Sequence, residues 1–127
     1  MKHFTLAELT HTNTGLPNEP TPEVIANLEY LVDNVLDPLR EIYGKSITVN
    51  CGYRSPAVNA KVGGVSNSQH LKGEAADITA GSKLENAVLF ELIRQRGKFD
   101  QLINEKDFTW VHVSYTKGKN RNQTLKL

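Results

Sequence analysis

The sequence contains a single cysteine, no long apolar run and almost no net charge, and each of these absences excludes a class of protein. Because Cys51 has no partner, an intramolecular disulfide is impossible and the fold does not depend on an oxidising compartment. No stretch approaches the roughly 18 consecutive apolar residues of a transmembrane helix, so we expect no membrane insertion. A net charge of +1, with Lys and Arg scattered along the chain, offers no basic stripe for binding nucleic acid.

What remains is the composition of an ordinary globular protein. Hydrophobic residues make up 39% and charged residues 23% of the 127 residues, which is typical of a soluble domain. This length and the lack of an internal repeat predict a single domain over residues 1–127, which we expect to be a monomer.

The longest predicted element is a helix from Pro22 to about Tyr43. Thr21 supplies an N-cap hydroxyl, Pro22 occupies the first turn, where its missing N–H costs nothing, and Gly44 ends the helix. Pro38 is expected to kink or restart it. One apolar stripe at spacings of three and four residues runs along it: Val24, Leu28, Leu31, Val35 and Leu39. We interpret this helix as a scaffold that covers one face of a sheet.

The remaining elements are short. Helices are predicted at 4–9, 56–62 and 83–96, and strands at 47–50, 74–79, 99–104 and 110–115, with an edge strand near 123–127. The helix at 83–96 is expected to face inward with Leu84, Val88, Leu92 and Ile93. Together these elements predict an α+β fold in which helices flank a small, mainly antiparallel sheet.

Three side chains suggest a metal site. His70 and Asp77 lie seven residues apart across Gly73, and His112 lies in the later strand. Strand alternation places Asp77 on one face with Ile78 pointing into the core, and it places His112 opposite its aliphatic neighbours. Nitrogen from His and oxygen from Asp are ligands that zinc accepts. Any one of them alone is more often an ordinary hydrogen-bonded polar group, but three in register favour a metal.

The motif around these residues resembles a known family of enzymes. The pattern Ser-x-His-x-x-Gly-x-Ala-x-Asp, then Trp-x-His, is similar to that of zinc D-Ala-D-Ala carboxypeptidases and phage L-alanyl-D-glutamate endopeptidases of the Peptidase M15 group. It consists here of Ser68, His70, Gly73, Ala75, Asp77, Trp110 and His112, with Gly52-Tyr53-Arg54-Ser55 and Asn59 upstream. The resemblance implies a Hedgehog/DD-peptidase-like fold, a Zn²⁺ cofactor held by His70, Asp77 and His112, and a peptidoglycan stem peptide as substrate.

Two further residues are candidates for substrate binding. Arg54 is predicted between a strand end and a helix start, where a guanidinium can bind a substrate carboxylate through two parallel hydrogen bonds or form an ordinary structural salt bridge. Ser68 can brace the metal loop or contact the substrate. Cys51, at a predicted strand end, is interpreted as a small buried filler, with a nucleophilic role as the alternative.

The general base is the open question of the motif. In many relatives an acidic residue lies three positions before the last histidine, and that position is Thr109 here. If a four-residue turn joins the last two long strands, Glu105 pairs with Trp110 and shares a face with His112, as does Gln101. Glu105 is then the candidate base that accepts a proton from the zinc-bound water, and Gln101 orients it or the substrate. Asp107 is the alternative base, and a solvent-exposed, salt-bridged Glu105 is the structural alternative.

These features predict a zinc-dependent peptidase that hydrolyses peptidoglycan stem peptides, as a D-Ala-D-Ala carboxypeptidase or as an endolysin-type endopeptidase. The missing acid at Thr109 favours one alternative, a catalytically inactive metal-binding module that binds cell wall or serves as a phage structural component. No signal peptide is visible, since Glu8 interrupts the apolar segment. We therefore expect a phage or prophage lysin that stays cytoplasmic until released, or an exported protein trimmed of its leader.

Overall fold

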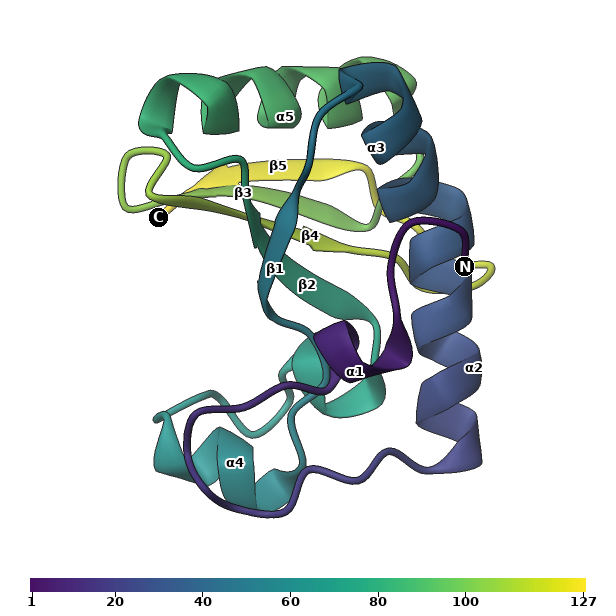
Figure 1. Cartoon of the computed structure of the whole chain (residues 1–127), viewed down its shortest axis with the longest axis vertical. Coiled ribbons are helices and arrows are strands. Elements are labelled where there is room, and N and C mark those ends of the chain that lie inside the picture. The colour runs from purple at the N-terminus through teal and green to yellow at the C-terminus, as the bar shows by residue number, and fades with distance from the viewer.

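A five-stranded sheet forms the centre of the computed structural model, which describes residues 1–127 (Figure 1). The strands lie in the order β1-β2-β4-β3-β5, and all neighbours are antiparallel except β3 and β5, which are parallel. Their bounds are Thr48–Cys51 for β1, Ala75–Thr79 for β2, Gln101–Glu105 for β3, Trp110–Ser114 for β4 and Gln123–Lys126 for β5. The predicted α+β class, the mainly antiparallel sheet and the C-terminal edge strand are confirmed.

Helices pack mostly on one side of this sheet. They are α1 (Leu6–Leu9), α2 (Pro22–Leu31), the π-helix η1 (Val32–Leu36), α3 (Asp37–Tyr43), α4 (Pro56–Lys61), the 3₁₀ helix η2 (Gln69–Lys72) and α5 (Lys83–Arg96). No helix is both long enough and apolar enough to cross a lipid bilayer. In Figure 1, α5 and the α2–α3 rod border the sheet, while α4 lies apart from them at the far end of β1 and β2.

The long predicted helix is present and carries a π-helical turn in its middle. Thr21 caps it through a hydrogen bond from Val24 N, and Gly44 ends it in the left-handed conformation. Pro38 lies in the first turn of α3, directly after the π-helix, which agrees with a restart at this proline. All five residues of the predicted apolar stripe are buried: Val24, Leu28, Leu31, Val35 and Leu39.

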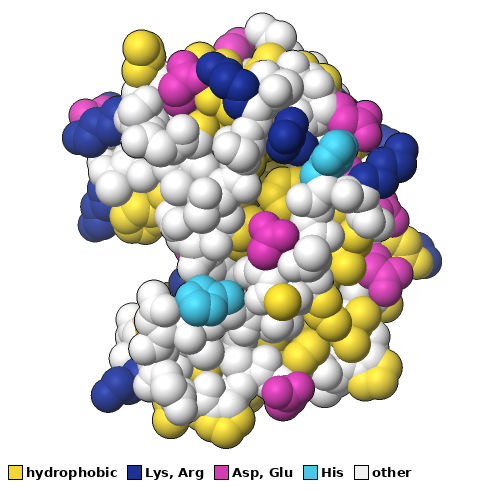
Figure 2. All heavy atoms as spheres, in the orientation of Figure 1, with side chains coloured by type: hydrophobic (Ala, Val, Ile, Leu, Met, Phe, Trp, Pro, Cys, Tyr) yellow, Lys and Arg dark blue, Asp and Glu magenta, His cyan; other side chains and the backbone are white.

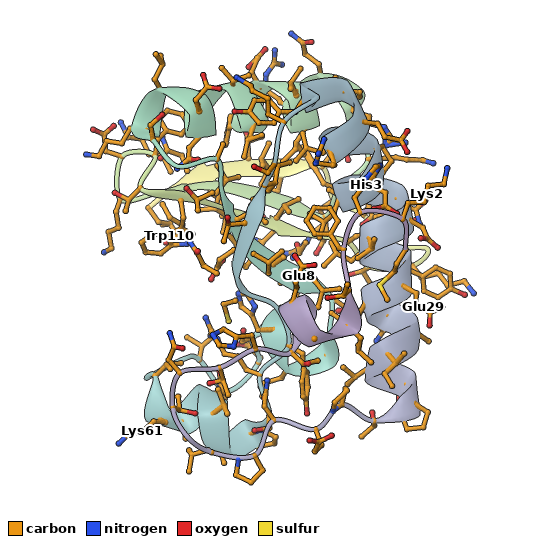
Figure 3. All side chains as sticks on the ribbon, viewed as in Figure 1. Lys2, His3, Glu8, Glu29, Lys61 and Trp110 are labelled. Carbon is orange, nitrogen blue, oxygen red and sulfur yellow. The ribbon has the colours of Figure 1, made fainter.

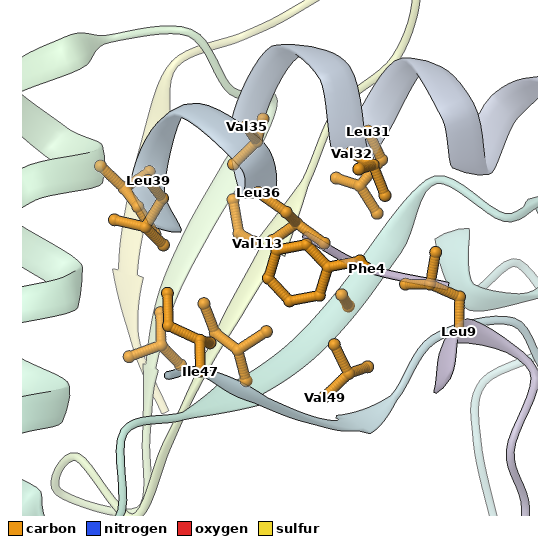
Figure 4. Packing of buried hydrophobic residues seen from close by; sticks show 14 of the residues in the cluster. Phe4, Leu9, Leu31, Val32, Val35, Leu36, Leu39, Ile47, Val49 and Val113 are labelled. Atoms are coloured by element: carbon orange, nitrogen blue, oxygen red, sulfur yellow. The ribbon is translucent and has the colours of Figure 1, made fainter. Parts of the chain in front are cut away.

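The hydrophobic core lies between these helices and one face of the sheet. Figure 4 shows Leu31, Val35 and Leu39 of the rod facing Val49 and Val113 of the sheet, with other apolar side chains between them. Because successive strand residues point to opposite faces, the side chains that alternate with this core lie on the other face. The core thus holds β1, β2 and β4 rigidly and leaves Asp77 and His112 on the side away from the rod.

The prediction for the inward face of α5 is wrong in part. Leu84 and Val88 are exposed by 77% and 39%, whereas Leu89 and Ile93 are buried. The third buried residue on this face is Asn86, which is 1% exposed. The helix does not turn its most apolar face toward the core, because the Asn86 side chain forms hydrogen bonds with the end of β2 and with the β3–β4 turn. The hydrogen bonds of this buried polar side chain therefore decide the orientation of α5.

Candidate metal centre and cleft

The site residues form a row across the sheet, on the face opposite the core. Asp77 of β2 pairs with Cys51 of β1 on one side and with His112 of β4 on the other. His112 in turn pairs with Ile103 of β3. Since cross-strand partners share a face, Asp77 lies between a thiol and an imidazole in the middle of this row.

The three predicted metal ligands meet in the structure. Asp77 Oδ2 lies 3.4 Å from His70 Nε2, and Asp77 Oδ1 lies 3.0 Å from His112 Nδ1. The two imidazole rings are 5.1 Å apart between centroids, nearly perpendicular to each other. Ligand atoms about 2.0–2.1 Å from a tetrahedral zinc ion are roughly 3.3 Å from one another, so each of the two His–Asp pairs fits zinc in chemistry and spacing.

The η2 turn orients His70 toward Asp77. His70 Nδ1 donates to Gly52 O at 2.6 Å, which leaves Nε2 facing the carboxylate. Ser68 Oγ accepts a hydrogen bond from His70 N, so Ser68 braces this turn as one of its two predicted roles requires. Gly73 follows in the left-handed conformation with φ +74°, and a Cβ there would lie 2.7 Å from Val24 O. The chain therefore turns from the histidine into β2 only with glycine at this position.

The electrostatics of the cluster favour an ion pair in the protein without metal. Burial lowers the pKa of His70, but hydrogen bonds with Asp77 and Cys51 outweigh it and raise the pKa from 6.5 to about 9. Burial raises the pKa of Asp77, but both histidines outweigh it and hold the pKa well below its usual value. The site thus concentrates negative charge that is neutralised by a proton on His70, and a divalent cation can take the place of that proton.

Cys51 is part of this cluster, which the sequence interpretation missed. Its side chain is only half-buried, and its Sγ lies 3.9 Å from His70 Nδ1 and 3.2 Å from Arg54 Nε. Potential ligand atoms of Cys51, His70 and Asp77 all lie within 4.8 Å of one another. The buried-filler interpretation is therefore corrected. The signal that could have identified this thiol from the sequence is the pairing of the two strands that carry Cys51 and Asp77.

Arg54 lies at the same end of the row. Its guanidinium contacts Asp77 Oδ2 at 3.7 Å and donates to Asn59 Oδ1 at 3.3 Å. Its backbone N donates to His70 O at 3.0 Å. The buried Asn18, which the sequence interpretation also missed, accepts from Ser55 N and donates to Tyr53 O. Arg54 is thus held between the helix cap and the predicted metal ligands, with 17% of its side chain exposed.

A cleft of about 320 Å³ opens at the other end of the row. The predicted site residues Ser68, Gln101, Glu105 and His112 line it, together with Gln69, Arg121 and three others. Glu105 pairs with Trp110 as predicted, so its half-buried side chain is on the His112 side of β3. Gln101 also lies in this wall, where its amide donates to Gln123 Oε1 of β5.

Asp107 is placed away from the cleft. It lies in the β3–β4 turn, 78% of its side chain is exposed, and its carboxylate faces Lys83 at 3.9 Å. Thr109 belongs to the same turn, where its hydroxyl donates to Lys106 O. Neither residue lines the cleft. Of the acidic candidates considered from the sequence, Glu105 is the one that the structure brings to His112.

A second hollow of about 220 Å³ adjoins Cys51 and Arg54 and includes His11 and Tyr53. The candidate metal centre therefore lies between two hollows, one toward β1 and one toward β3. In Figure 2 the surface is indented between the α5 end and the α4 end of the molecule. Figure 3 places Trp110 on the sheet side of this indentation and Lys61 on α4 at the other side.

Comparison with known proteins agrees with this geometry. The sequence model of the family described as Peptidase M15 matches residues 2–114. A zinc D-Ala-D-Ala carboxypeptidase from Streptomyces albus G is 42% identical over 83 residues, which are 64% of this chain and 32% of the relative. The chain thus spans about a third of that relative's length. With the family match covering nearly all of the sequence and the site, the chain belongs to the Peptidase M15 family.

Proposed function

We propose that this protein is a zinc-dependent peptidase that hydrolyses peptidoglycan stem peptides, as a D-Ala-D-Ala carboxypeptidase or an endolysin-type endopeptidase. The observation that carries the proposal is the His70–Asp77–His112 cluster beside a cleft whose wall contains both His112 and Glu105. The similarity to a zinc D-Ala-D-Ala carboxypeptidase supports this class of substrate.

His70, Asp77 and His112 would hold the metal. Zinc supplies Lewis acidity when bound: it polarises the scissile carbonyl and acidifies a water molecule. Gly52 O fixes the ring of His70, since a backbone acceptor on the second ring nitrogen sets which nitrogen faces the metal. Asp77 lies within reach of both imidazoles, so it also keeps their orientations coupled.

Glu105 would accept a proton from the attacking water and pass it to the leaving amine. Its position on the His112 side of β3 and in the cleft wall supports this role, because a general base must come within hydrogen-bond reach of the reacting water. Arg54 would bind a carboxylate of the substrate at the opposite end of the row. Its contact with Asp77 keeps the guanidinium next to the metal centre, where that carboxylate would be close to the scissile bond.

One experiment tests the proposal against its rival. Purified protein with added zinc is incubated with purified peptidoglycan and with synthetic peptides that contain L-Ala-D-Glu or end in D-Ala-D-Ala, and the products are identified by mass spectrometry. We expect cleavage at one of these bonds and none by His70→Ala. Zinc binding with no cleavage of any substrate would overturn the proposal and favour the non-catalytic wall-binding module that Thr109 suggests.

A further inference from the structure

Arg121 is a cleft residue that lies outside the part of the chain matched by the family model, which ends at residue 114. It belongs to the segment between β4 and β5. This segment folds back so that Arg121 lines the same cleft as Glu105 and His112. The cleft wall thus includes one residue, Arg121, that the comparison with the family does not cover.

Asp100 holds the Arg121 side chain in place. Arg121 Nε donates to Asp100 Oδ1 and Arg121 Nη2 donates to Asp100 Oδ2, both at 2.9 Å, and Arg121 N also donates to Oδ1. These hydrogen bonds hold the pKa of Asp100 at about 2 even though burial acts in the opposite direction, so the pair stays ionised. Gln69, another cleft residue, donates to Asp100 Oδ2 as well. The guanidinium is thus pre-oriented rather than free to rotate.

The exposed end of this ion pair is the cation. The Asp100 side chain is 3% exposed, whereas that of Arg121 is 58% exposed. Arg121 Nη1 makes no hydrogen bond within the protein. A guanidinium has five N–H donors, and the pair with Asp100 uses two of them, so the remaining donors are available to a second carboxylate.

We propose that Arg121 binds a second carboxylate of the substrate, distinct from the one assigned to Arg54, and thereby selects peptides with a free interior carboxylate. The inference rests on the proposed peptidase function. Arg54 contacts Asp77 in β2, while Arg121 is bonded to Asp100 at the start of β3, two strands further along the sheet. Two interstrand spacings are about 10 Å, and Asp100 is three residues along the chain from Ile103, which lies in the same row as Asp77, so the offset along the strand adds about 10 Å at a right angle. The separation is then about 14 Å, and because an extended peptide rises about 3.3 Å per residue, the two carboxylates would be about four residues apart.

The test uses synthetic stem-type peptides in which one interior carboxylate at a time is replaced by its carboxamide. For the wild-type protein with zinc, we expect one such replacement to raise KM by about tenfold to a hundredfold, the range of one charge-assisted hydrogen-bonded contact. In Arg121→Gln that replacement should have no effect. Lys119→Gln, which removes an exposed cation from the same segment, should behave as wild type. Arg121→Lys keeps a charge opposite Asp100, and we expect it to fold and to lose most of the discrimination.

Direct binding separates this inference from the proposed function. Calorimetric titration of the same peptides into Glu105→Gln protein should show the same loss of affinity when the carboxylate is replaced by its carboxamide. In the double variant with Glu105→Gln and Arg121→Gln, this replacement should no longer change the affinity. Discrimination in binding without any turnover by the wild type would overturn the peptidase and keep the role of Arg121. Turnover with equal KM for every amidated peptide, or an equal loss for all peptides in Arg121→Gln, would overturn the role of Arg121 alone.

Discussion

Glu105 lies directly opposite Trp110 across the β3–β4 ladder, which places its side chain on the face that carries His112. The relationship depends on the turn between them, in which Lys106, Asp107 and Phe108 all have positive φ. Three consecutive non-glycine residues in this region are unfavourable, so other contacts must hold the turn. Asn104 Oδ1 accepts from Phe108 N, and the Asn86 amide donates to the carbonyls of Phe108 and Thr109. Two buried asparagines thus fix the position of the candidate base.

Replacing Glu105 with Gln should lower kcat by about a hundredfold or more, the scale of general-base removal, because the amide cannot accept the proton. Zinc content and the midpoint of thermal unfolding should not change, since the Glu105 side chain is only half-buried, in the wall of the cleft. Asp107→Asn is the matched control and should turn over normally, because Asp107 lies in the exposed turn. Normal turnover by Glu105→Gln with loss in Asp107→Asn would reverse the assignment.

Substitution can distinguish the predicted metal ligands from the neighbouring thiol. His70→Ala and His112→Ala should each lose most bound zinc after dialysis, because removing one of three ligands leaves an incomplete site. Cys51→Ser should retain about one equivalent of zinc, as measured by atomic absorption. Loss of zinc in Cys51→Ser with retention in His112→Ala would instead assign the metal to Cys51, His70 and Asp77, whose ligand atoms also cluster.

Zinc binding should release a proton at about pH 7. His70 in the metal-free protein has a pKa raised from 6.5 to about 9, so it is protonated at that pH and must lose the proton to bind the metal. The apparent affinity for zinc should therefore rise with pH up to about 9, by at most about tenfold per pH unit. Calorimetry in buffers with different ionisation enthalpies counts the released protons, and a count of zero would contradict this.

The raised pKa of His70 also affects the stability of the metal-free protein, which should fall as the pH rises, whereas the affinity for zinc should increase. The folded-state pKa of His70 lies above its unfolded value of 6.5, so the stabilisation is fully present below about pH 6.5 and is lost as the pH rises through about 9. Urea denaturation in the presence of a chelator, repeated across this window, should show decreasing stability with pH. The His70→Ala protein should not show this decrease.

Arg54→Lys should raise KM by about tenfold to a hundredfold, because lysine keeps the charge but cannot form two parallel hydrogen bonds with a carboxylate. The protein should remain folded, since the backbone of Arg54 is held by His70 O and its neighbours by Asn18. Unchanged kinetics in a folded variant would make the contact with Asp77 the whole role of this residue.

Local patterns in the sequence predicted much of the fold and the centre of the site. The stripe from Val24 to Leu39 and the alternation around Asp77 and His112 are set by burial of apolar side chains, which repeats with the period of the element. The contacts of Asn18, Asn86 and Arg121 could not be predicted in this way. Each of them joins segments that are distant in the sequence: Asn86 bonds Phe108, and Arg121 bonds Asp100. A single polar residue carries no periodic signal, so the sequence pattern does not reveal such contacts. The interpretation of Cys51 as a buried filler was wrong because its neighbour Asp77 is brought to it by strand pairing, which local patterns do not reveal.

The stability of α5 and of the β3–β4 turn should depend on Asn86 rather than on the more apolar Leu84. The Asn86 amide donates to Phe108 O and Thr109 O and accepts from Ala80 N and Thr79 Oγ1, while it is 1% exposed. Asn86→Ala leaves these buried partners unpaired, and we expect it to lower the free energy of unfolding by about 2–4 kcal/mol, given about 1–3 kcal/mol for each unsatisfied buried group. Leu84→Ala should change it by less than about 0.5 kcal/mol, because the Leu84 side chain is 77% exposed. Urea denaturation of both variants measures the difference. A larger loss in Leu84→Ala would restore the apolar stripe that the sequence predicts for this helix.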